Sequence, residues 1–595
     1  MKVQKTLRLA LGAGLFTSLL QLAPAQVTAS YTLLLSEGDA MPGFPGELIT
    51  RIDDVDVNGN GDWLAEVATD GATAQNTYVV HNGNTIWVES GNLGFTAPVG
   101  GIAGGFMDTM QINDNGDILL VFPLTHPVNG SITVMTVNGV TVIDAKTTVC
   151  GAANVPAGTI YDSISEAWMN NNNQLLVACR LLVPGATSSV DALVRMDING
   201  TGGIVSETKI AMVGETLPGP NHVTPIQGFS FSKARQAIND NGDFIWYVDD
   251  DHTVAPGSTL TDSNMYINNT LLYNEADPFP LDPVNAFEHF STCEVDLNDA
   301  GDFVFSGFDS GDNAEDSWIF KSIGGTPTMI AHESEACPAA MGPYLTAGFG
   351  FGGLVPMSDS GDVLWYIDTD STDTTTDQGV FYNDTLVCRE NTTVLSGQTV
   401  TSVPDGDTEI AMSDDGKIAV FEVVLGTTID ALYRVDFLPP AGVTFCDPAD
   451  VNSTGAPAVL SASFGTGVGS DLHLEGTGGP TGEFGYILVG AGSVDPGVLL
   501  PQGGHLCLDT ALPIGRYNLA GTGGSVGQFD ASGVLQNLVG TSTVGSGFDV
   551  PSNLPTTGSP AIMSGETWYF QLWYRDTPAG VGMANLSNGL AVTFP

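Results

Sequence analysis

The sequence has little positive charge. Its 595 residues include 67 Asp or Glu but only 16 Lys or Arg, which gives a formal net charge of −51 at pH 7. Nucleic acids and anionic membranes are bound through basic surfaces that neutralise phosphate, so this composition excludes both as partners. Hydrophobic residues still make up 42% of the chain, which is enough to bury cores and excludes an acidic disordered tail. We therefore expect an acidic, folded protein.

Long apolar runs are absent except near the N-terminus. Lys2, Lys5 and Arg8 precede an apolar stretch over residues 9–20, and Ala23-Pro24-Ala25 follows with small residues suited to cleavage. A membrane span needs about 20 apolar residues, and this stretch is shorter. Residues 1–25 therefore predict a secretory signal peptide, and we expect an extracellular protein, free or attached to the cell surface, with no membrane span.

The common catalytic and metal-binding signatures are also missing. The eight histidines show no HExxH or HxH spacing, and there is no CxxC pair and no GxSxG nucleophile motif. The phrase FGTGVGS at residues 464–470 is similar to a dinucleotide loop, but it lies among predicted strands rather than before a helix. The sequence therefore predicts no catalytic residue and no certain cofactor.

Seven cysteines lie at positions 150, 179, 293, 337, 388, 446 and 507. Export favours disulfides. Cys446 and Cys507 fall in one C-terminal region and form the best candidate pair. The two further candidates, Cys150 with Cys179 and Cys337 with Cys388, each bracket one repeat. Cys293 has no candidate partner and is expected to be a buried thiol.

One phrase occurs seven times along the chain. Examples are VNGNGDWLAEV from Val57, INDNGDFIWYV from Ile238 and MSDDGKIAVFE from Met412, and successive copies are 55 to 69 residues apart. Asn, Ser and Asp favour tight turns, and a glycine can take a positive φ before an apolar strand begins. The third copy has Asn173 at the glycine position, and Asn is the next most tolerant residue for that conformation. The phrase therefore predicts a turn that leads into a strand.

A second turn follows within many copies, as at Asn82-Gly83 and Asn138-Gly139, so one period holds four strands. Together with 74 glycines, this pattern predicts an all-β fold. Four antiparallel strands in each of seven periods are typical of a seven-bladed β-propeller, which we place at residues 26–438. The seventh period ends after ALYRVDF without a fourth strand, while YTLLLS, from Tyr31, stands alone before the first. We therefore expect the N-terminal strand to complete the last blade.

The repeat ends near Pro440, and short alternating strands follow. Their regular spacing predicts a C-terminal β-sandwich over residues 441–595. The aromatic run WYFQLWYRD could offer a sugar-stacking platform. Its alternation instead favours a core face made of Trp568, Phe570, Leu572 and Tyr574.

The phrase MSDDGKIAVFE resembles the blades of TolB-like propellers, and the INDNGD copies with GDAMPG and GETLPG exit loops look like tandem-repeat propellers of secreted bacterial proteins. This resemblance covers most of residues 31–437. The segment from Cys446, with HLCLDT and WYFQLWYRD, resembles a C-terminal domain of exported, planctomycete-like proteins. The resemblances imply a fold and export, and they carry over no catalytic residue.

Two groups of acidic and amide residues are candidates for binding. The first resembles the start of a calcium loop but has Val67 where a bidentate Glu is needed, which excludes an EF-hand and leaves a looser calcium site or a plain hairpin turn. Its members are Asp54, Asp56, Asn58, Asn60 and Asp62. The second group stands at the ends of the predicted fourth strands, where it could form a ring that collects cations, or each Glu could simply accept backbone hydrogen bonds. Its members are Glu37, Glu89, Glu215, Glu275, Glu333 and Glu390.

Two functions fit these features. We favour a secreted, non-enzymatic binding or surface-structural module for an extracellular protein or glycan, with calcium as a stabilising ion. The alternative is an extracellular polysaccharide hydrolase or lyase that uses carboxylates of the propeller funnel as acid and base.

Overall fold

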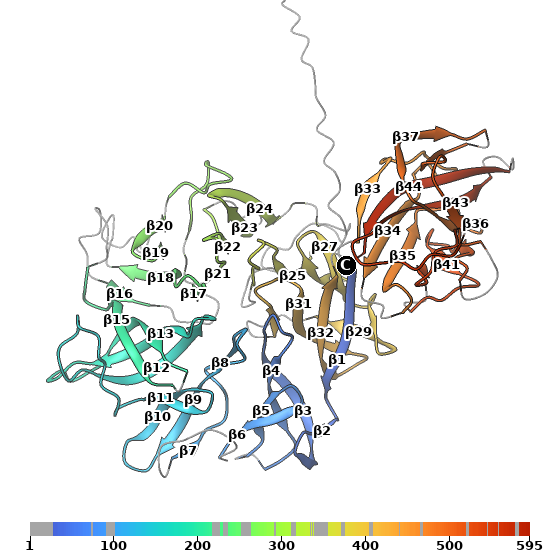
Figure 1. Ribbon diagram of the computed structural model, residues 1–595. Helices are drawn as coiled ribbons and strands as arrows, with labels where there is room; N and C mark the ends of the chain where they lie inside the picture. The colour runs from blue at the N-terminus through green and yellow to red at the C-terminus, as the bar shows by residue number, and fades with distance from the viewer. Residues whose placement is uncertain are drawn as a thin grey trace, which may run out of the picture.

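The computed structural model describes residues 28–594, apart from 73–74, 91–100, 201, 217–225, 230–235, 251–262, 276, 289, 291–292, 311–316, 334, 336, 338–354, 370–374, 404–408, 439–440, 465–467, 502, 519–522, 544–545, 557 and 578–581. The expected signal peptide lies outside these residues. The described part of the chain consists of β-strands and their connections, with no helix, so the all-β prediction is confirmed (Figure 1). No helix in this part is long and apolar enough to cross a membrane.

Seven antiparallel sheets form from the described residues up to Leu438. The first contains β2 (Ala40–Met41), β3 (Phe44–Val57), β4 (Trp63–Thr69), β5 (Thr77–His81) and β6 (Asn84–Val88). The second contains β7 (Ile102–Ala103), β8 (Thr109–Ile112), β9 (Ile118–His126), β10 (Gly130–Val137) and β11 (Val140–Asp144). The third contains β12 (Ile160–Met169), β13 (Gln174–Leu182), β14 (Val190–Ile198) and β15 (Ile204–Met212).

The remaining four sheets follow in chain order. The fourth contains β16 (Ile226–Gly228), β17 (Gln236–Ile238), β18 (Phe244–Asp250), β19 (Ser263–Ile267) and β20 (Thr270–Asn274). The fifth contains β21 (Glu294–Leu297), β22 (Phe303–Phe308), β23 (Ser317–Ile323) and β24 (Thr326–His332), and the sixth β25 (Leu364–Asp368), β26 (Gln378–Tyr382) and β27 (Thr385–Arg389). The seventh contains β1 (Thr28–Ser36), β28 (Val394–Leu395), β29 (Gln398–Ser402), β30 (Ile410–Met412), β31 (Ile418–Leu425) and β32 (Ile429–Leu438).

The repeated phrase forms the same turn in each of these sheets. Six of the seven turn positions are glycines with φ between 69° and 81°, and Asn173 takes φ 56° at the remaining one. The second turns use the same conformation, with φ 49° at Asn82 and 51° at Asn138. The backbone reason inferred for the phrase is therefore confirmed.

The first strand pairs with the last strand of the repeat region. In the antiparallel β1–β32 register, Tyr31 lies opposite Val435 and Ser36 opposite Ala431. The expected pairing of these two segments is therefore present. It joins chain positions about 400 residues apart. The Tyr31 hydroxyl makes a second long-range contact, because it donates to the carbonyl of Val387, 356 positions later.

Hydrophobic cores join each sheet to the next. A core between the first and second sheets contains Leu64 and Leu120, and equivalent cores follow between successive sheets up to the seventh. A further core contains Val55 of the first sheet together with Val420 and Leu432 of the seventh. The seven shared cores thus form a cycle that returns to its starting sheet.

The C-terminal strands gather on one side of these sheets (Figure 1). One sheet contains β33 (Val443–Phe445), β36 (Phe484–Gly490), β39 (Ile514–Arg516), β40 (Gly527–Phe529), β41 (Leu535–Asn537), β43 (Thr567–Asp576) and β44 (Met583–Thr593). A second contains β34 (Val459–Phe464), β35 (Leu472–Thr477) and β42 (Phe548–Asp549), and a third β37 (Ser493–Leu499) and β38 (His505–Leu508). The first two share one core, which holds Leu474 as well as Phe570, Leu572 and Tyr574, with Trp568 packed against it. The core interpretation of the aromatic run is confirmed.

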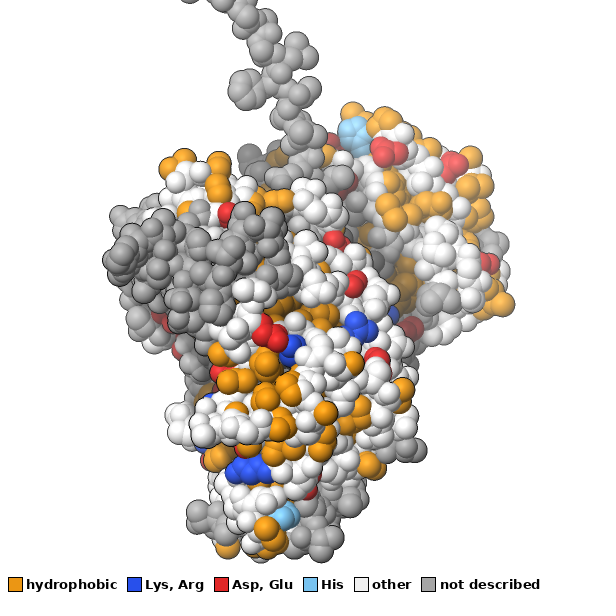
Figure 2. Space-filling model, turned by 90° about the vertical axis from the view of Figure 1, so that its left-hand side faces the viewer, with side chains coloured by type: hydrophobic (Ala, Val, Ile, Leu, Met, Phe, Trp, Pro, Cys, Tyr) orange, Lys and Arg blue, Asp and Glu red, His pale blue; other side chains and the backbone are white. Residues whose placement is uncertain are grey.

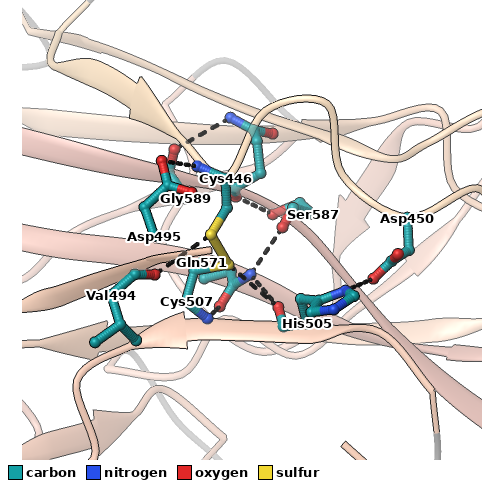
Figure 3. The surroundings of a disulfide bond; sticks show 10 residues. Cys446, Asp450, Val494, Asp495, His505, Cys507, Gln571, Ser587 and Gly589 are labelled. Atoms are coloured by element: carbon teal, nitrogen blue, oxygen red, sulfur yellow. Dashed lines mark hydrogen bonds and ion pairs between the residues drawn. A yellow bond between two sulfur atoms is a disulfide. The ribbon is translucent and has the colours of Figure 1, made fainter. Parts of the chain in front are cut away.

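The predicted Cys446–Cys507 disulfide is present (Figure 3). It fastens the segment after β33 to β38. The Gln571 side chain of β43 holds β38 nearby, because its Oε1 accepts the Cys507 N–H at 2.9 Å and its Nε2 donates to the His505 carbonyl at 2.9 Å.

The other two predicted disulfides are not formed, and their four cysteines are free and buried. Cys337 lies in the core between the fifth and sixth sheets, whereas Cys388 lies in the core between the sixth and seventh. Cys150 and Cys179 share one core, but the Cys179 thiol lies 3.6 Å from the Ala192 carbonyl. Bracketing one repeat therefore left Cys337 and Cys388 in different cores, whereas Cys150 and Cys179 lie in the same core without forming a disulfide. Cys293 is buried, as expected.

Candidate functional site

The repeated turns of successive sheets are linked by a series of hydrogen bonds from Asn side-chain amides. In five of the seven phrases, the Nδ2 group of the first polar residue donates to the main-chain carbonyl of the equivalent residue in the next sheet. The links are Asn58 to Asn113 (2.9 Å), Asn113 to Asn170 (3.1 Å), Asn170 to Asn239 (2.7 Å), Asn239 to Asn298 (2.8 Å) and Asn298 to Ser358 (3.3 Å). We call these residues and those that directly follow them the turn belt.

A second set of hydrogen bonds runs along the turn belt beside the first. Here a side-chain oxygen in one sheet accepts the main-chain N–H of the preceding sheet. The acceptors are Asp114 (from Gly59, 2.6 Å), Asn171 (from Asp114, 2.6 Å), Asp240 (from Asn171, 2.6 Å), Asp299 (from Asp240, 2.8 Å) and Asp359 (from Asp299, 3.1 Å). The four aspartates among these acceptors therefore each link two sheets through a charge-assisted hydrogen bond.

Carboxylates from several sheets converge on Asn171. Its Nδ2 group lies 2.9 Å from Asp240 Oδ2, 3.2 Å from Asp414 Oδ2 and 3.4 Å from Asp114 Oδ2. These residues belong to the turns of the second, fourth and seventh sheets. One amide therefore bridges three carboxylates that would otherwise repel one another.

A small acidic cavity of about 170 Å³ lies beside the turn belt, and Asn113, Asn171 and Asp414 of the belt contribute to its lining. Its lining includes Asp56, Asp296 and Asp414. Burial, followed by the negative charges of Asp114, Asp296, Asp240 and Asp359, raises the pKa of Asp414 to about 8. Burial also raises the pKa of Asp296 to about 6, although the N–H groups of Met357 and Leu297 oppose that change. At neutral pH the Asp414 carboxyl group is therefore mainly protonated, chiefly because it is buried.

A second acidic cluster involves the first and seventh sheets. Glu66 of β4 and Glu422 of β31 are both buried, and burial is the main reason that the pKa of each rises to about 9. The charge of Asp53 raises both pKa values further, whereas Arg51 lowers both. Glu66 also accepts the Met107 N–H at 3.2 Å. At neutral pH both carboxyl groups are therefore protonated and enclosed in protein.

The model of a family of unknown function, DUF7453, matches residues 16–406 of the chain. The chain belongs to this family. The match covers most of the repeat region, and the C-terminal strands lie beyond it. No curated protein matches this DUF7453 member.

Solved structures similar to this DUF7453 member include two propeller-related proteins. The β-propeller domain of the Trilobed protease from Pyrococcus furiosus is 8% identical, with a TM-score of 0.31, and the match covers 64% of this chain and 94% of that one. TolB from Acinetobacter baumannii is 10% identical, with a TM-score of 0.27, and the match covers 66% of this chain and 80% of that one.

The predicted calcium residues of the DUF7453 member are occupied by turn contacts. Asp56 Oδ2 accepts the Ile112 N–H at 2.7 Å, and Asn58 Oδ1 accepts the N–H groups of Asn60 and Asp62 at 3.1 and 2.9 Å. Among the residues that the structure describes, no group of three or more His, Cys, Asp or Glu is arranged to hold a metal ion. Calcium binding by Asp54, Asp56, Asn58, Asn60 and Asp62 stays a prediction.

The predicted ring of glutamates is engaged within individual sheets. Four carboxylates accept a main-chain N–H from the neighbouring strand of their own sheet: Glu37 from Asp430 (3.4 Å), Glu89 from Asn76 (3.3 Å), Glu275 from Ser263 (3.3 Å) and Glu333 from Ser317 (3.2 Å). Glu215 pairs with Lys209, and burial together with Asp377 raises the pKa of Glu390. The contacts of Glu37, Glu89, Glu275 and Glu333 fit the simpler alternative, in which each Glu accepts backbone hydrogen bonds, whereas Glu215 forms an ion pair with Lys209.

The carboxylates that do converge stand one position after the first polar residue of each phrase. Sequence reasoning used that residue only as a turn former. Aligning the seven copies on that residue shows that the next position is an aspartate in five of them. The residues at this position are Gly59, Asp114, Asn171, Asp240, Asp299, Asp359 and Asp414. Three of these aspartates, Asp114, Asp240 and Asp414, lie within 3.4 Å of the Asn171 Nδ2 group.

Proposed function

We propose that residues 26–438 form a seven-bladed β-propeller closed by β1 and that residues 441–595 form a β-sandwich. The cycle of seven shared cores and the β1–β32 pairing support the closed propeller. The core shared by the sheets of β34 and β43 supports the sandwich. Closing the cycle leaves no open end to the array of sheets, which protects strand edges from unwanted pairing.

We further propose that the protein is an exported, non-enzymatic binding or surface-structural module for an extracellular protein or glycan. The observation that carries this proposal is the use of the turn-belt carboxylates. Asp114, Asp240 and Asp299 each accept a main-chain N–H from another sheet, as an architectural residue does. A glycosidase acid must reach the glycosidic oxygen, whereas Glu66 and Glu422 are enclosed in protein.

A panel of immobilised glycans and extracellular proteins tests this function. The full-length protein should be retained by a member of the panel without releasing new reducing ends from any polysaccharide. Release of reducing ends, or of unsaturated sugar products, would instead support the hydrolase or lyase.

Calcium is expected to raise the melting temperature, because it would neutralise part of the negative charge in the turn belt. Since the described residues offer no ready set of three acidic ligands, we expect the effect in the millimolar range. Thermal melts with calcium, magnesium or chelator measure it. Asp414→Asn should weaken the response if calcium acts at the turn belt, whereas Asp62→Asn should weaken it if calcium acts at the predicted loop. An identical melt at all calcium concentrations would contradict the calcium proposal.

A further inference from the structure

The Cys446–Cys507 disulfide lies at a cavity of about 240 Å³ in the C-terminal part of the chain, and both cysteines line it. We call this space the disulfide cavity. The bond joins the segment after β33 to β38, while β33 itself pairs with β44 at three positions. The disulfide therefore contributes much of what fixes the first strand of the C-terminal part.

The two cysteines differ in their access to solvent. Cys446 is partly exposed, whereas Cys507 is 1% exposed. A Cβ at position 497 would lie 2.5 Å from Cys507 Sγ, so the backbone of Gly497 already packs against that sulfur. A disulfide opens when a thiolate attacks one of its sulfur atoms. A thiolate that enters the cavity therefore attacks Cys446 Sγ, and Cys507 is the leaving group.

The surroundings of Cys507 oppose its departure as a thiolate. Its sulfur lies 3.5 Å from the His505 carbonyl oxygen, and its N–H group already donates to Gln571. The described lining of the cavity holds no Lys or Arg that could stabilise a new negative charge. Burial and a neighbouring carbonyl oxygen both disfavour the thiolate, so attack from the cavity is slow.

Three carboxylates surround the sulfur that can be reached. Asp447, Asp450 and Asp495 line the cavity, and Asp495 Oδ2 accepts the Cys446 N–H at 3.3 Å. His505 also lines it, with Nδ1 2.6 Å from Asp450 Oδ2. Asp495 and the His505–Asp450 pair lie on opposite sides of the disulfide in Figure 3. Even a positive charge on His505 would leave the carboxylates in excess.

This negative charge acts on any second charge that the attacking thiol carries. An ammonium group on the thiol is attracted by the carboxylates, whereas a sulfonate or carboxylate group is repelled. Asp447 and Asp495 are exposed, so dissolved salt should weaken the effect. Small thiols of equal reactivity should therefore open the bond at different rates according to their charge.

We propose that the disulfide cavity directs thiol exchange to Cys446 and selects cationic thiols over anionic ones, with Asp447, Asp450 and Asp495 as the selecting groups. This inference concerns the response of the C-terminal part to reductants, and it does not depend on the proposed binding function.

The exchange has two steps. First, the thiolate sulfur of the small thiol bonds to Cys446 Sγ, the Sγ–Sγ bond breaks, and Cys507 leaves with the electron pair and takes a proton from water. Second, another thiolate attacks the small-molecule sulfur of the mixed disulfide and releases Cys446, which is protonated in turn. Two small thiols are thus oxidised to one small disulfide for each protein disulfide that is reduced.

The test measures reduction of the folded, full-length protein at pH 8 and low ionic strength with cysteamine, 2-mercaptoethanol or 2-mercaptoethanesulfonate. Alkylation and peptide mass spectrometry follow Cys446 and Cys507. Each rate is divided by the rate at which the same thiol reduces an uncharged small disulfide, which removes differences in intrinsic reactivity. The normalised rate for cysteamine should exceed that for 2-mercaptoethanesulfonate about tenfold, and added salt should narrow the difference. The mixed disulfide should carry cysteamine on Cys446.

Two double variants separate local charge from total charge. Asp447→Asn with Asp495→Asn removes two carboxylates of the cavity and keeps an acceptor for the Cys446 N–H. It should bring the normalised rates for the cationic and anionic thiols to within about threefold of each other. The control, Asp39→Asn with Glu335→Gln, removes two exposed charges from the repeat region and should keep the wild-type ratio. Melting temperatures of both variants verify folding.

Three results would overturn the inference. Equal normalised rates for the three thiols on the wild type would contradict charge selection. A preference for cysteamine that is the same in both double variants would assign the selection to the charge of the whole molecule and not to the cavity. Cysteamine attached to Cys507, or no reduction of the folded protein by any of the three thiols, would contradict attack on Cys446.

Discussion

Replacing Glu66 by Gln should make the protein more stable at neutral pH and leave its stability at pH 4.5 unchanged. The pKa of Glu66 rises from 4.5 to about 9 on folding, chiefly through burial. At low pH both the folded and the unfolded chain carry the proton, so the carboxyl group costs nothing. Above pH 4.5 the unfolded chain loses the proton while the folded chain keeps it, which favours unfolding by about 1.4 kcal/mol per pH unit.

At pH 7 this difference amounts to about 3 kcal/mol, which Glu66→Gln should recover because the amide stays neutral at every pH. For a cooperative unit of about 400 residues, that free energy corresponds to roughly 3 to 4 °C in melting temperature. Differential scanning calorimetry from pH 4.5 to 8 measures it. The exposed Glu335 provides the control, since Glu335→Gln should leave the pH dependence of the wild type intact. A Glu66→Gln variant with the same pH dependence as the wild type would refute the reasoning.

Three further changes test other contacts. Asn239→Ala removes the amide that donates to the Asn298 carbonyl and the oxygen that accepts the Asp243 N–H. It should lower the free energy of unfolding by about 1–3 kcal/mol in denaturant titrations. An unchanged unfolding midpoint would contradict a stabilising role of the turn belt. Gly116→Ala has open space for its Cβ but forces Ala to φ 78°, so it should cost about 1 kcal/mol, whereas Gly416→Ala, whose Cβ would lie 2.8 Å from Ser358 Cβ, should cost more. Equal costs would contradict the steric argument. The double variant Cys446→Ser, Cys507→Ser removes a cross-link between residues 61 positions apart, and the loss of loop-closure entropy should lower the free energy of unfolding of the C-terminal part by about 4 kcal/mol. The melting temperature of the C-terminal transition should fall, and that of the repeat region should not.

Backbone features were the most predictable from the sequence. Few residue types adopt a positive φ readily, so the residue types at Gly61 and Asn173 were enough to predict their backbone conformation. The β1–β32 pairing was also predictable, because the last period lacked a strand and the first residues supplied one. Alternation in the aromatic run identified the buried face that holds Phe570 and Leu572.

Side-chain convergence was less predictable. The pairing of Cys446 with Cys507 followed from their shared region, but Cys337 and Cys388 show that sequence proximity does not decide which core a thiol enters. The glutamates at strand ends, such as Glu89 and Glu275, are engaged within their own sheets, where each accepts a main-chain N–H. The convergence on Asn171 depends on the distance between turns of separate sheets, which no local pattern contains.

The pairing between β1 and β32 also affects the order in which the chain can fold. The first strand is synthesised about 400 residues before its partner, which takes roughly 20–80 s at ordinary rates of synthesis. During that interval the strand that contains Leu33 and Leu35 is unpaired, so its edge is available for aggregation or for pairing with another chain. A newly made molecule therefore depends on its final repeat to protect its beginning, and truncation anywhere before Leu438 would leave both ends of the array unprotected.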